Sequence, residues 1–239
     1  GSFSTILDHD GGTGNYTGAW FAIHQQHSQV YWASNNANQI SGGTLSLSWN
    51  HIAVVRSGST TTLYVNGSSV ANYTDNLNYT DSITRGLYIG TQNGTARRFG
   101  GYISNLRLVK GTAVYTSNFT VPTAPLTAIT NTKLLCCQSD TSPTAAAVSP
   151  GSITNNGSTA STSNPFDNVD NLGSLLLDGT NDYIIVPDNA DLELGNSDFT
   201  IEAFIKPTGS QGSGFNNLFT KGWELQGYYK SDGAFTLYS

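Results

Sequence analysis

The segment from residue 20 to residue 32 holds the side chains best suited to bind a sugar. Sugar recognition needs exposed aromatic faces for stacking and a few polar groups for the hydroxyls. The candidate glycan-binding residues are Trp20, His24, Gln26, Tyr31 and Trp32. In a strand, alternation puts Trp20 and His24 on the face opposite Phe21 and Ile23, which suit a core. The alternative is that Trp20 and Trp32 are themselves core anchors.

The triplet Asn-x-Ser/Thr, the acceptor for N-linked glycans in secreted eukaryotic proteins, recurs along the chain. The acceptor asparagines are Asn15, Asn66, Asn72, Asn78, Asn93, Asn118 and Asn156. A chain rich in Asn, Ser and Thr also produces such triplets by chance. Asn66 and Asn93 have a second role, because each is followed by Gly in a pair typical of turns.

The only cysteines, Cys136 and Cys137, are neighbours. Successive side chains of a strand point to opposite faces, so we expect one thiol in the core and the other half-exposed. A bond between neighbours would be strained, and we expect none. The chain has no Cys/His spacing typical of a metal site.

Short runs rich in Val, Ile, Thr, Tyr and Phe recur, with Gly, Asn, Asp and Ser between them. Such runs predict strands, and we find no amphipathic helix. Asn66-Gly67 and Asp178-Gly179 favour type I′ hairpin turns, because both central positions of that turn need a positive φ. Many strands joined by tight turns predict an all-β sandwich or jelly roll.

The stretch 215–239 resembles the stretch 3–34. Each has an apolar strand, a loop, a strand that begins with Trp (Trp20 or Trp223) and a short strand that ends in Ser. Such self-similarity indicates tandem copies of one domain. The sequence therefore predicts two partial copies, with 1–137 the C-terminal part of a first domain and 174–239 the N-terminal part of a second.

Residues 138–173, rich in Ser, Thr, Ala and Pro, have almost no large apolar side chain. A segment of this composition cannot bury enough surface to offset its ordering entropy. We therefore expect a linker or an extended surface strap, pinned at its far end by Phe166 and Val169.

Only 11% of the residues are charged, so Ser, Thr, Asn and Gly must cover the surface, as is common in secreted or virion-exposed β proteins. The formal net charge is −6, and nucleic-acid binding would need clustered Lys and Arg, so we expect no nucleic-acid partner. No apolar run reaches the roughly 20 residues of a membrane span, so we expect no membrane insertion.

Three segments resemble laminin G-like domains with a concanavalin A-like jelly roll. Residues 174–187 with 198–207 resemble the opening of such a domain. Residues 49–56 with 62–67 are similar to its central hairpin, and 86–90 with 99–107 to its late strands. The opening segment comes last here, as a second copy would require. The resemblance implies a concanavalin A-like jelly-roll β-sandwich.

A narrower resemblance covers residues 106–136 and the linker after them. They are similar to a variant found in repetitive, tail fibre-like structural proteins of marine and cyanobacterial phages. This implies a non-enzymatic structural and adhesive module of a virion or an extracellular filament. The implied partners are other copies of the domain, in tandem or head to tail, and cell-surface glycans. The alternatives are a lectin domain of a secreted adhesin and a glycan hydrolase.

Laminin G-like domains often hold one Ca²⁺, so the resemblance makes calcium the candidate cofactor. Hard cations take oxygen ligands, and the candidate ligands are Asp178, Asn181, Asp182 and Asp188. The alternative is that Asp178-Gly179 is only a turn pair and that the other side chains solvate loops.

The same jelly roll also carries β-glucanases, which need two carboxylates in the pattern Glu-x-Asp-x-Glu on one strand face. Here Glu occurs only at 193, 202 and 224, and the nearest approach to the pattern is Asp191-Leu-Glu193 in a loop. The chain also lacks a nucleophile elbow. We therefore expect no hydrolytic activity.

Overall fold

A computed structural model describes residues 3–7, 19–24, 30–34, 37–79, 86–91, 94, 98–166, 169–208 and 219–221. Side-chain environments are described at Val30 and Ile40 and, within these ranges, from residue 42 to residue 208. The regular elements in this part are strands and one short 3-10 helix, η1 (Ala190–Leu192), so the predicted all-β class is confirmed. No helix in these ranges has the length and apolarity that crossing a membrane requires.

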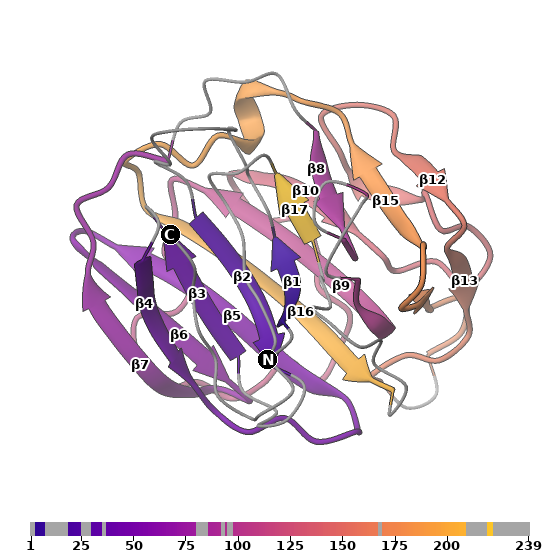
Figure 1. The fold of residues 1–239 in the computed structure, drawn as a ribbon, viewed down its shortest axis with the longest axis horizontal. Coiled ribbons are helices and arrows are strands. Elements are labelled where there is room, and N and C mark those ends of the chain that lie inside the picture. The colour runs from indigo at the N-terminus through magenta and orange to yellow at the C-terminus, as the bar shows by residue number, and fades with distance from the viewer. Residues whose placement is uncertain are drawn as a thin grey trace.

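The larger sheet has nine antiparallel strands (Figure 1). Its main order is β11 (Ala146–Val148), β10 (Thr132–Cys136), β9 (Gly100–Lys110), β16 (Phe199–Pro207), β5 (Asn50–Ser57), β6 (Thr60–Val65) and β7 (Ser68–Thr74). Two more strands complete it, because β14 (Ser174–Asp178) also pairs with β9, and β13 (Thr159–Ser161) pairs with β14.

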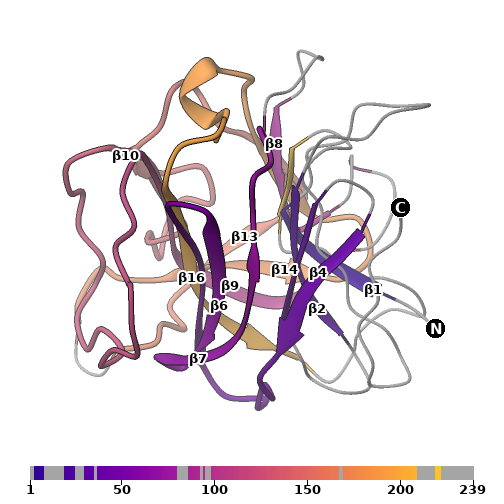
Figure 2. The same ribbon diagram turned by 90° about the vertical axis from the view of Figure 1, so that its left-hand side faces the viewer.

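The second layer consists of two four-stranded sheets. One runs β12 (Thr154–Asn156), β15 (Tyr183–Val186), β8 (Leu87–Ile89) and β17 (Phe219–Lys221). The other runs β1 (Phe3–Leu7), β2 (Ala19–His24), β3 (Val30–Ser34) and β4 (Ala37–Gly42). β1 lies beside β17 (Figure 1). Figure 2 shows this layer facing the larger sheet, as in a jelly-roll sandwich.

One apolar core fills the space between the layers. Its largest fully buried side chains are Phe99, Phe199, Ile52 and Leu63. β16 shows how the sequence builds it, because Ile201, Ala203 and Ile205 alternate toward the core. At the β6–β7 hairpin, Asn66 and Gly67 have φ of 49° and 78°, as the predicted type I′ turn requires.

Two strands of the segments that resemble a domain opening, β14 and β16, lie in the larger sheet beside β5 and β9. β16 is hydrogen-bonded to β5 on one side and to β9 on the other, and β14 pairs with the start of β9. β15 and β8 pair with each other in the second layer, so the stretches 50–136 and 174–207 contribute to both layers and share one core. Two tandem copies stay a prediction, and Trp223, expected to match Trp20, lies outside the described residues.

Residues 138–166 and 169–173, here called the strap, follow the surface of the sandwich. They contain β11, β12 and β13, which pair with β10, β15 and β14 respectively. Phe166 is buried in a small apolar cluster, and Val169 packs against that cluster. The short strands were not predicted, because three residues each are too few to show the apolar alternation that marks a strand.

Candidate functional site

The outer face of the larger sheet, turned away from the second layer, is covered by residues 111–131, here called the cover segment (Figure 2). Tyr115 and Phe119 of the cover segment stack on each other, with ring centroids 3.6 Å apart and planes 7° apart. They pack on Ala53, Val55 and Tyr64 of β5 and β6. The segment therefore closes much of this face to solvent.

A buried polar network lies beneath the cover segment, with Glu202 of β16 at its centre. Glu202 Oε1 accepts hydrogen bonds from Arg107 Nε at 2.9 Å and Nη2 at 2.6 Å. Its Oε2 accepts from Tyr115 Oη at 2.8 Å and lies 3.0 Å from His51 Nε2. Arg107 also donates from Nη1 to the Thr127 carbonyl at 2.8 Å. Cross-strand pairing of β5, β16 and β9 brings these side chains together.

The environment keeps Glu202 ionised. Burial raises the pKa of its carboxyl group, but the hydrogen bond and charge of His51, the charge of Arg107 and the Tyr115 hydroxyl together lower it below the usual value. Burial, followed by the charge and hydrogen bond of Glu202, raises the pKa of Tyr115. His51 Nδ1 is buried without a hydrogen-bond partner in the described part of the chain.

This network is not arranged for glycoside hydrolysis. A general acid must hold a proton at working pH, and a carboxylate beside a buried guanidinium does not. The neighbours of Glu202 on the same strand face are Thr200 and Phe204, so β16 offers no second carboxylate. Asp191, in η1, pairs with Lys133 at 2.8 Å on the surface.

Beyond the cover segment, three partly exposed side chains lie on neighbouring strands of the same sheet face. Trp49 precedes β5, Lys206 is in β16, and Tyr102 of β9 is its register partner. The rings of Trp49 and Tyr102 have centroids 6.2 Å apart and planes inclined by 56°. Lys206 Nζ lies over one face of the Tyr102 ring, 5.3 Å from its centroid. We call these three residues the aromatic row.

The aromatic row was not predicted as a site. Its members are far apart in the sequence, and only the strand order β5, β16, β9 makes them neighbours. A Trp just before a strand and a Tyr just inside another are the only local signals. A second pair, Tyr88 and Tyr183, lies on the other layer, with centroids 5.8 Å apart. These two rings are also partly exposed.

Most of the predicted glycan-binding residues lie in described strands, but their side chains are outside the described part. Strand register sets Trp20 opposite Ala33, and Tyr31 opposite Ala22. Trp32 is opposite Ile40 on β4. His24 is the last residue of β2, and Gln26 lies outside the described residues. Sugar binding by this set therefore stays a prediction.

The structure brings together some of the predicted calcium ligands. Asp178 Oδ1 accepts from the backbone N–H of Thr180 and Asn181, and Asp182 Oδ2 accepts from that of Asp178. Burial, and then the charge of Asp178, raise the pKa of Asp182, although the backbone hydrogen bond lowers it. Asp188 follows β15, so it lies at the opposite end of that strand from this turn.

The described residues contain no group of three or more His, Cys, Asp or Glu side chains placed to hold a metal ion. In the turn at Asp178, the carboxylates of Asp178 and Asp182 already accept backbone hydrogen bonds. Calcium binding stays a prediction, which a calcium titration followed by thermal unfolding tests.

The sequon asparagines have different surroundings. Asn15 and Asn93 lie outside the described residues. The side chains of Asn66, Asn118 and Asn156 are engaged in hydrogen bonds to His51, Ser69 and Asn181 respectively. All five of the described sequon asparagines are exposed, and Asn72 and Asn78 differ from the other three because their side chains are not engaged in this way. Among the described sequons, these two are the most open to modification.

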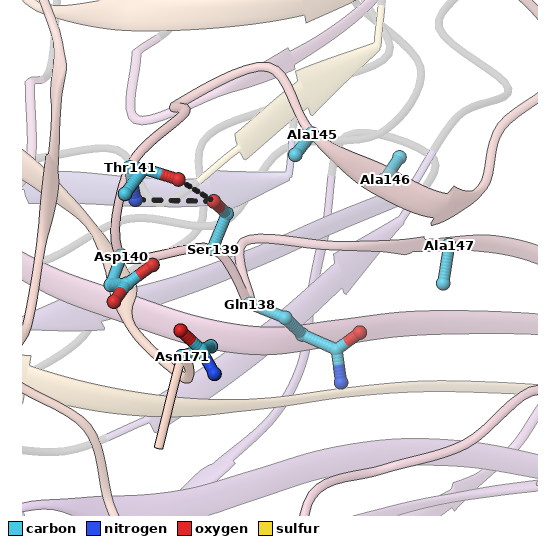
Figure 3. Close-up of a pocket in the computed structure, with 8 residues that line it drawn as sticks. All are labelled: Gln138, Ser139, Asp140, Thr141, Ala145, Ala146, Ala147 and Asn171. Carbon is cyan, nitrogen blue, oxygen red and sulfur yellow. Dashed lines mark hydrogen bonds between the residues drawn. The ribbon is translucent and has the colours of Figure 1, made fainter.

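Figure 3 shows a pocket of about 420 Å³ on the strap. Its lining residues are Gln138, Ser139, Asp140, Thr141, Ala145, Ala146, Ala147 and Asn171. In this pocket, Ser139 Oγ accepts a hydrogen bond from the Thr141 backbone N–H at 3.2 Å. The lining offers no aromatic face for a sugar and no cluster of like charges for an ion. We assign it no role.

The architecture is that of an all-β, concanavalin A-like jelly-roll sandwich, as the sequence predicted. Residues 1–114 match a family model described as the concanavalin A-like lectin/glucanases superfamily. The matched stretch includes Trp49, His51, Tyr102 and Arg107, and it ends before Glu202. A search of curated proteins and a search of solved structures each gave no match.

Proposed function

We propose that this chain is a non-enzymatic structural and adhesive module that binds glycans through the aromatic row. The observation that carries the proposal is the placement of two partly exposed rings and one ammonium group on three adjacent strands. Aromatic faces beside a hydrogen-bond donor are the chemistry that sugar recognition uses. The similarity of residues 1–114 to a superfamily of lectins and glucanases supports a carbohydrate ligand.

The geometry favours an oligosaccharide over a single sugar. Because the Trp49 and Tyr102 ring planes are inclined by 56°, one flat sugar face cannot stack on both. Neighbouring units of a sugar chain can each use one ring. Lys206 then donates hydrogen bonds to hydroxyl or carboxylate oxygens between them. The ionised, covered Glu202 and the missing second carboxylate on β16 support binding without hydrolysis.

A glycan array followed by calorimetry on the best ligand tests this proposal. Tyr102→Ala should weaken binding about tenfold or more, which corresponds to about 1.4 kcal/mol. Lys206→Gln should weaken it less. Tyr88→Ala, which removes a partly exposed ring from the other layer, is the matched control and should leave binding unchanged.

Two results would overturn parts of the proposal. If Tyr88→Ala or Trp20→Ala abolished binding while Tyr102→Ala did not, the ligand would belong to another surface. If no glycan bound at all, the adhesive function through sugars would be wrong. Trp49→Ala is a weaker test, because Trp49 also packs against the Phe166 cluster. Circular dichroism should show that each variant keeps its strand content.

The setting we propose is a virion, as part of a tail fibre-like protein, or an extracellular filament. The resemblance of residues 106–136 to repetitive phage proteins and the polar, weakly charged surface support it. Other copies of the domain would then be its partners, in tandem or head to tail. Mass measurement of the protein at its source tests this. A species no larger than this chain would argue against tandem copies.

A further inference from the structure

The two adjacent cysteines are both buried, and their sulfur atoms are in contact. Cys136 is fully buried, and Cys137 is only 4% exposed. The Sγ atoms lie 3.4 Å apart. The expectation of one buried and one half-exposed thiol is therefore wrong. The reason is local, because Cys137 has φ of 62°, which ends the strand alternation and turns both side chains into the core.

The fold fixes this left-handed turn from two sides. The Asn105 backbone, itself at φ of 54°, donates to the Cys137 carbonyl at 3.2 Å. Asn105 Oδ1 accepts from Gln138 Nε2 at 2.7 Å and from the Leu126 N–H at 2.8 Å. The residue after the pair is thus tied to β9, and so is the cover segment. The conformation of Cys137 belongs to the fold, not to a loose chain end.

No bond between the two sulfurs is expected in a regular strand, but Cys137 is not part of one. In a regular strand the thiols would point to opposite faces, but here they already touch. In the folded protein the thiols react slowly. The hydrogen bond with Cys137 and then burial raise the pKa of Cys136, and the thiolate is the reactive form. Oxidation therefore belongs to the refolding period, when the turn at Cys137 has formed but burial of the two thiols is not yet complete.

We propose that Cys136 and Cys137 form a vicinal disulfide when the chain folds in the presence of a small-molecule disulfide such as oxidised glutathione. One cysteine thiolate attacks a glutathione sulfur, which forms a mixed disulfide and releases one glutathione thiolate. The second cysteine thiolate then displaces the other glutathione. The protein loses two protons and two electrons, and oxidised glutathione is reduced to two molecules of glutathione.

The bond should be easily reduced. The Cα atoms of neighbouring residues are about 3.8 Å apart across a trans peptide. Unstrained disulfides have Cα atoms at least about 4.4 Å apart. A strained disulfide has a higher reduction potential and reverts under mild reductants. The pair is thus a redox-sensitive link at the junction of β10, β9 and the strap.

The test is to refold the reduced chain with an excess of oxidised glutathione, block the remaining thiols with iodoacetamide in denaturant and measure the intact mass. The expected product is an unalkylated monomer about 2 Da lighter than the reduced chain, since two hydrogens are lost. Two alkylated thiols, a retained glutathione adduct or a disulfide-linked dimer as the main product would each overturn the proposal.

Two controls separate the role of the fold from the mere adjacency of the thiols. The same oxidation in guanidinium chloride should give less of the vicinal disulfide. An equal yield would show that the fold does not place the two thiols for this bond. Asn105→Ala, which removes the side-chain tie to Gln138 and Leu126, should lower the yield in native buffer. Cys137→Ala should keep a glutathione adduct, because its single thiol has no neighbour to resolve it.

Discussion

Arg107 donates two hydrogen bonds to one oxygen of Glu202, at 2.9 Å and 2.6 Å, inside a face that the cover segment closes. The Glu202 side chain is fully buried, and that of Arg107 is 6% exposed. Two opposite charges without bulk water depend on each other, because either alone would be a buried uncompensated charge. The other oxygen of Glu202 accepts a hydrogen bond from Tyr115 of the cover segment. One carboxylate therefore links β5, β9 and β16 to the segment that covers them.

Glu202→Gln should therefore destabilise the fold strongly. The substitution keeps the shape but leaves the Arg107 charge unpaired, and breaking a buried pair costs about 3–5 kcal/mol. Urea unfolding measures the change. Lys133→Ala, which removes the exposed pair with Asp191, is the matched control and should cost at most about 1 kcal/mol. Equal losses in the two variants would contradict the central role of Glu202.

Stability should fall in acid because of the same carboxylate. The pKa of Glu202 is lowered in the folded state, whereas an unfolded Glu has a pKa of about 4.3. The folded state therefore binds fewer protons, so its advantage is full above the unfolded value and is lost as pH falls through the folded pKa. Unfolding free energies measured from pH 7 to pH 3 should show this decline. Glu202→Gln should flatten the curve, and an unchanged slope would argue against this assignment.

Gly67→Ala should cost more than Gly58→Ala. Both glycines have positive φ, at 78° and 58°, so both variants pay the left-handed strain of about 1–2 kcal/mol. At Gly67 an added Cβ would also overlap the Phe119 carbonyl oxygen, whereas at Gly58 it would meet nothing within 4 Å. The overlap with Phe119 should loosen the cover segment, and limited proteolysis within residues 111–131 can detect this change. Similar costs and similar proteolysis would mean that the segment does not depend on this contact.

No reducing sugar should be released from β-glucans or other common polysaccharides. The Asp191 and Glu193 carboxylates lie at η1, and Asp191 pairs with Lys133 on the surface. Product formation that disappears in Glu193→Gln would show that the carboxylates at η1 form an active site. Product that survives in that variant but disappears in Glu202→Gln, at a temperature where circular dichroism shows Glu202→Gln folded, would place the chemistry beneath the cover segment.

Local patterns predicted the strand content and the turns well, because alternation and Asn-Gly pairs act over a few residues. The β6–β7 hairpin follows directly from such a pattern. The aromatic row and the Glu202 network could not be predicted in this way. They depend on which strands become neighbours, and His51 and Glu202 are 151 residues apart in the chain. The turn at Cys137 was missed because its sequence carries no Gly or Asn turn signal, and its partner, the Asn105 N–H of β9, is distant in the chain.

The position of β16 between β5 and β9 also sets an order of folding. Until residues 199–207 have been synthesised, β5 and β9 each keep an open edge and an apolar face. Contacts between such distant segments form late and slowly. A nascent chain that ends before β16 therefore exposes unpaired strand edges, which can pair with another chain. Productive folding has to wait for a strand that is synthesised after both of its neighbours, and crowding of unfinished chains before that point favours misassembly.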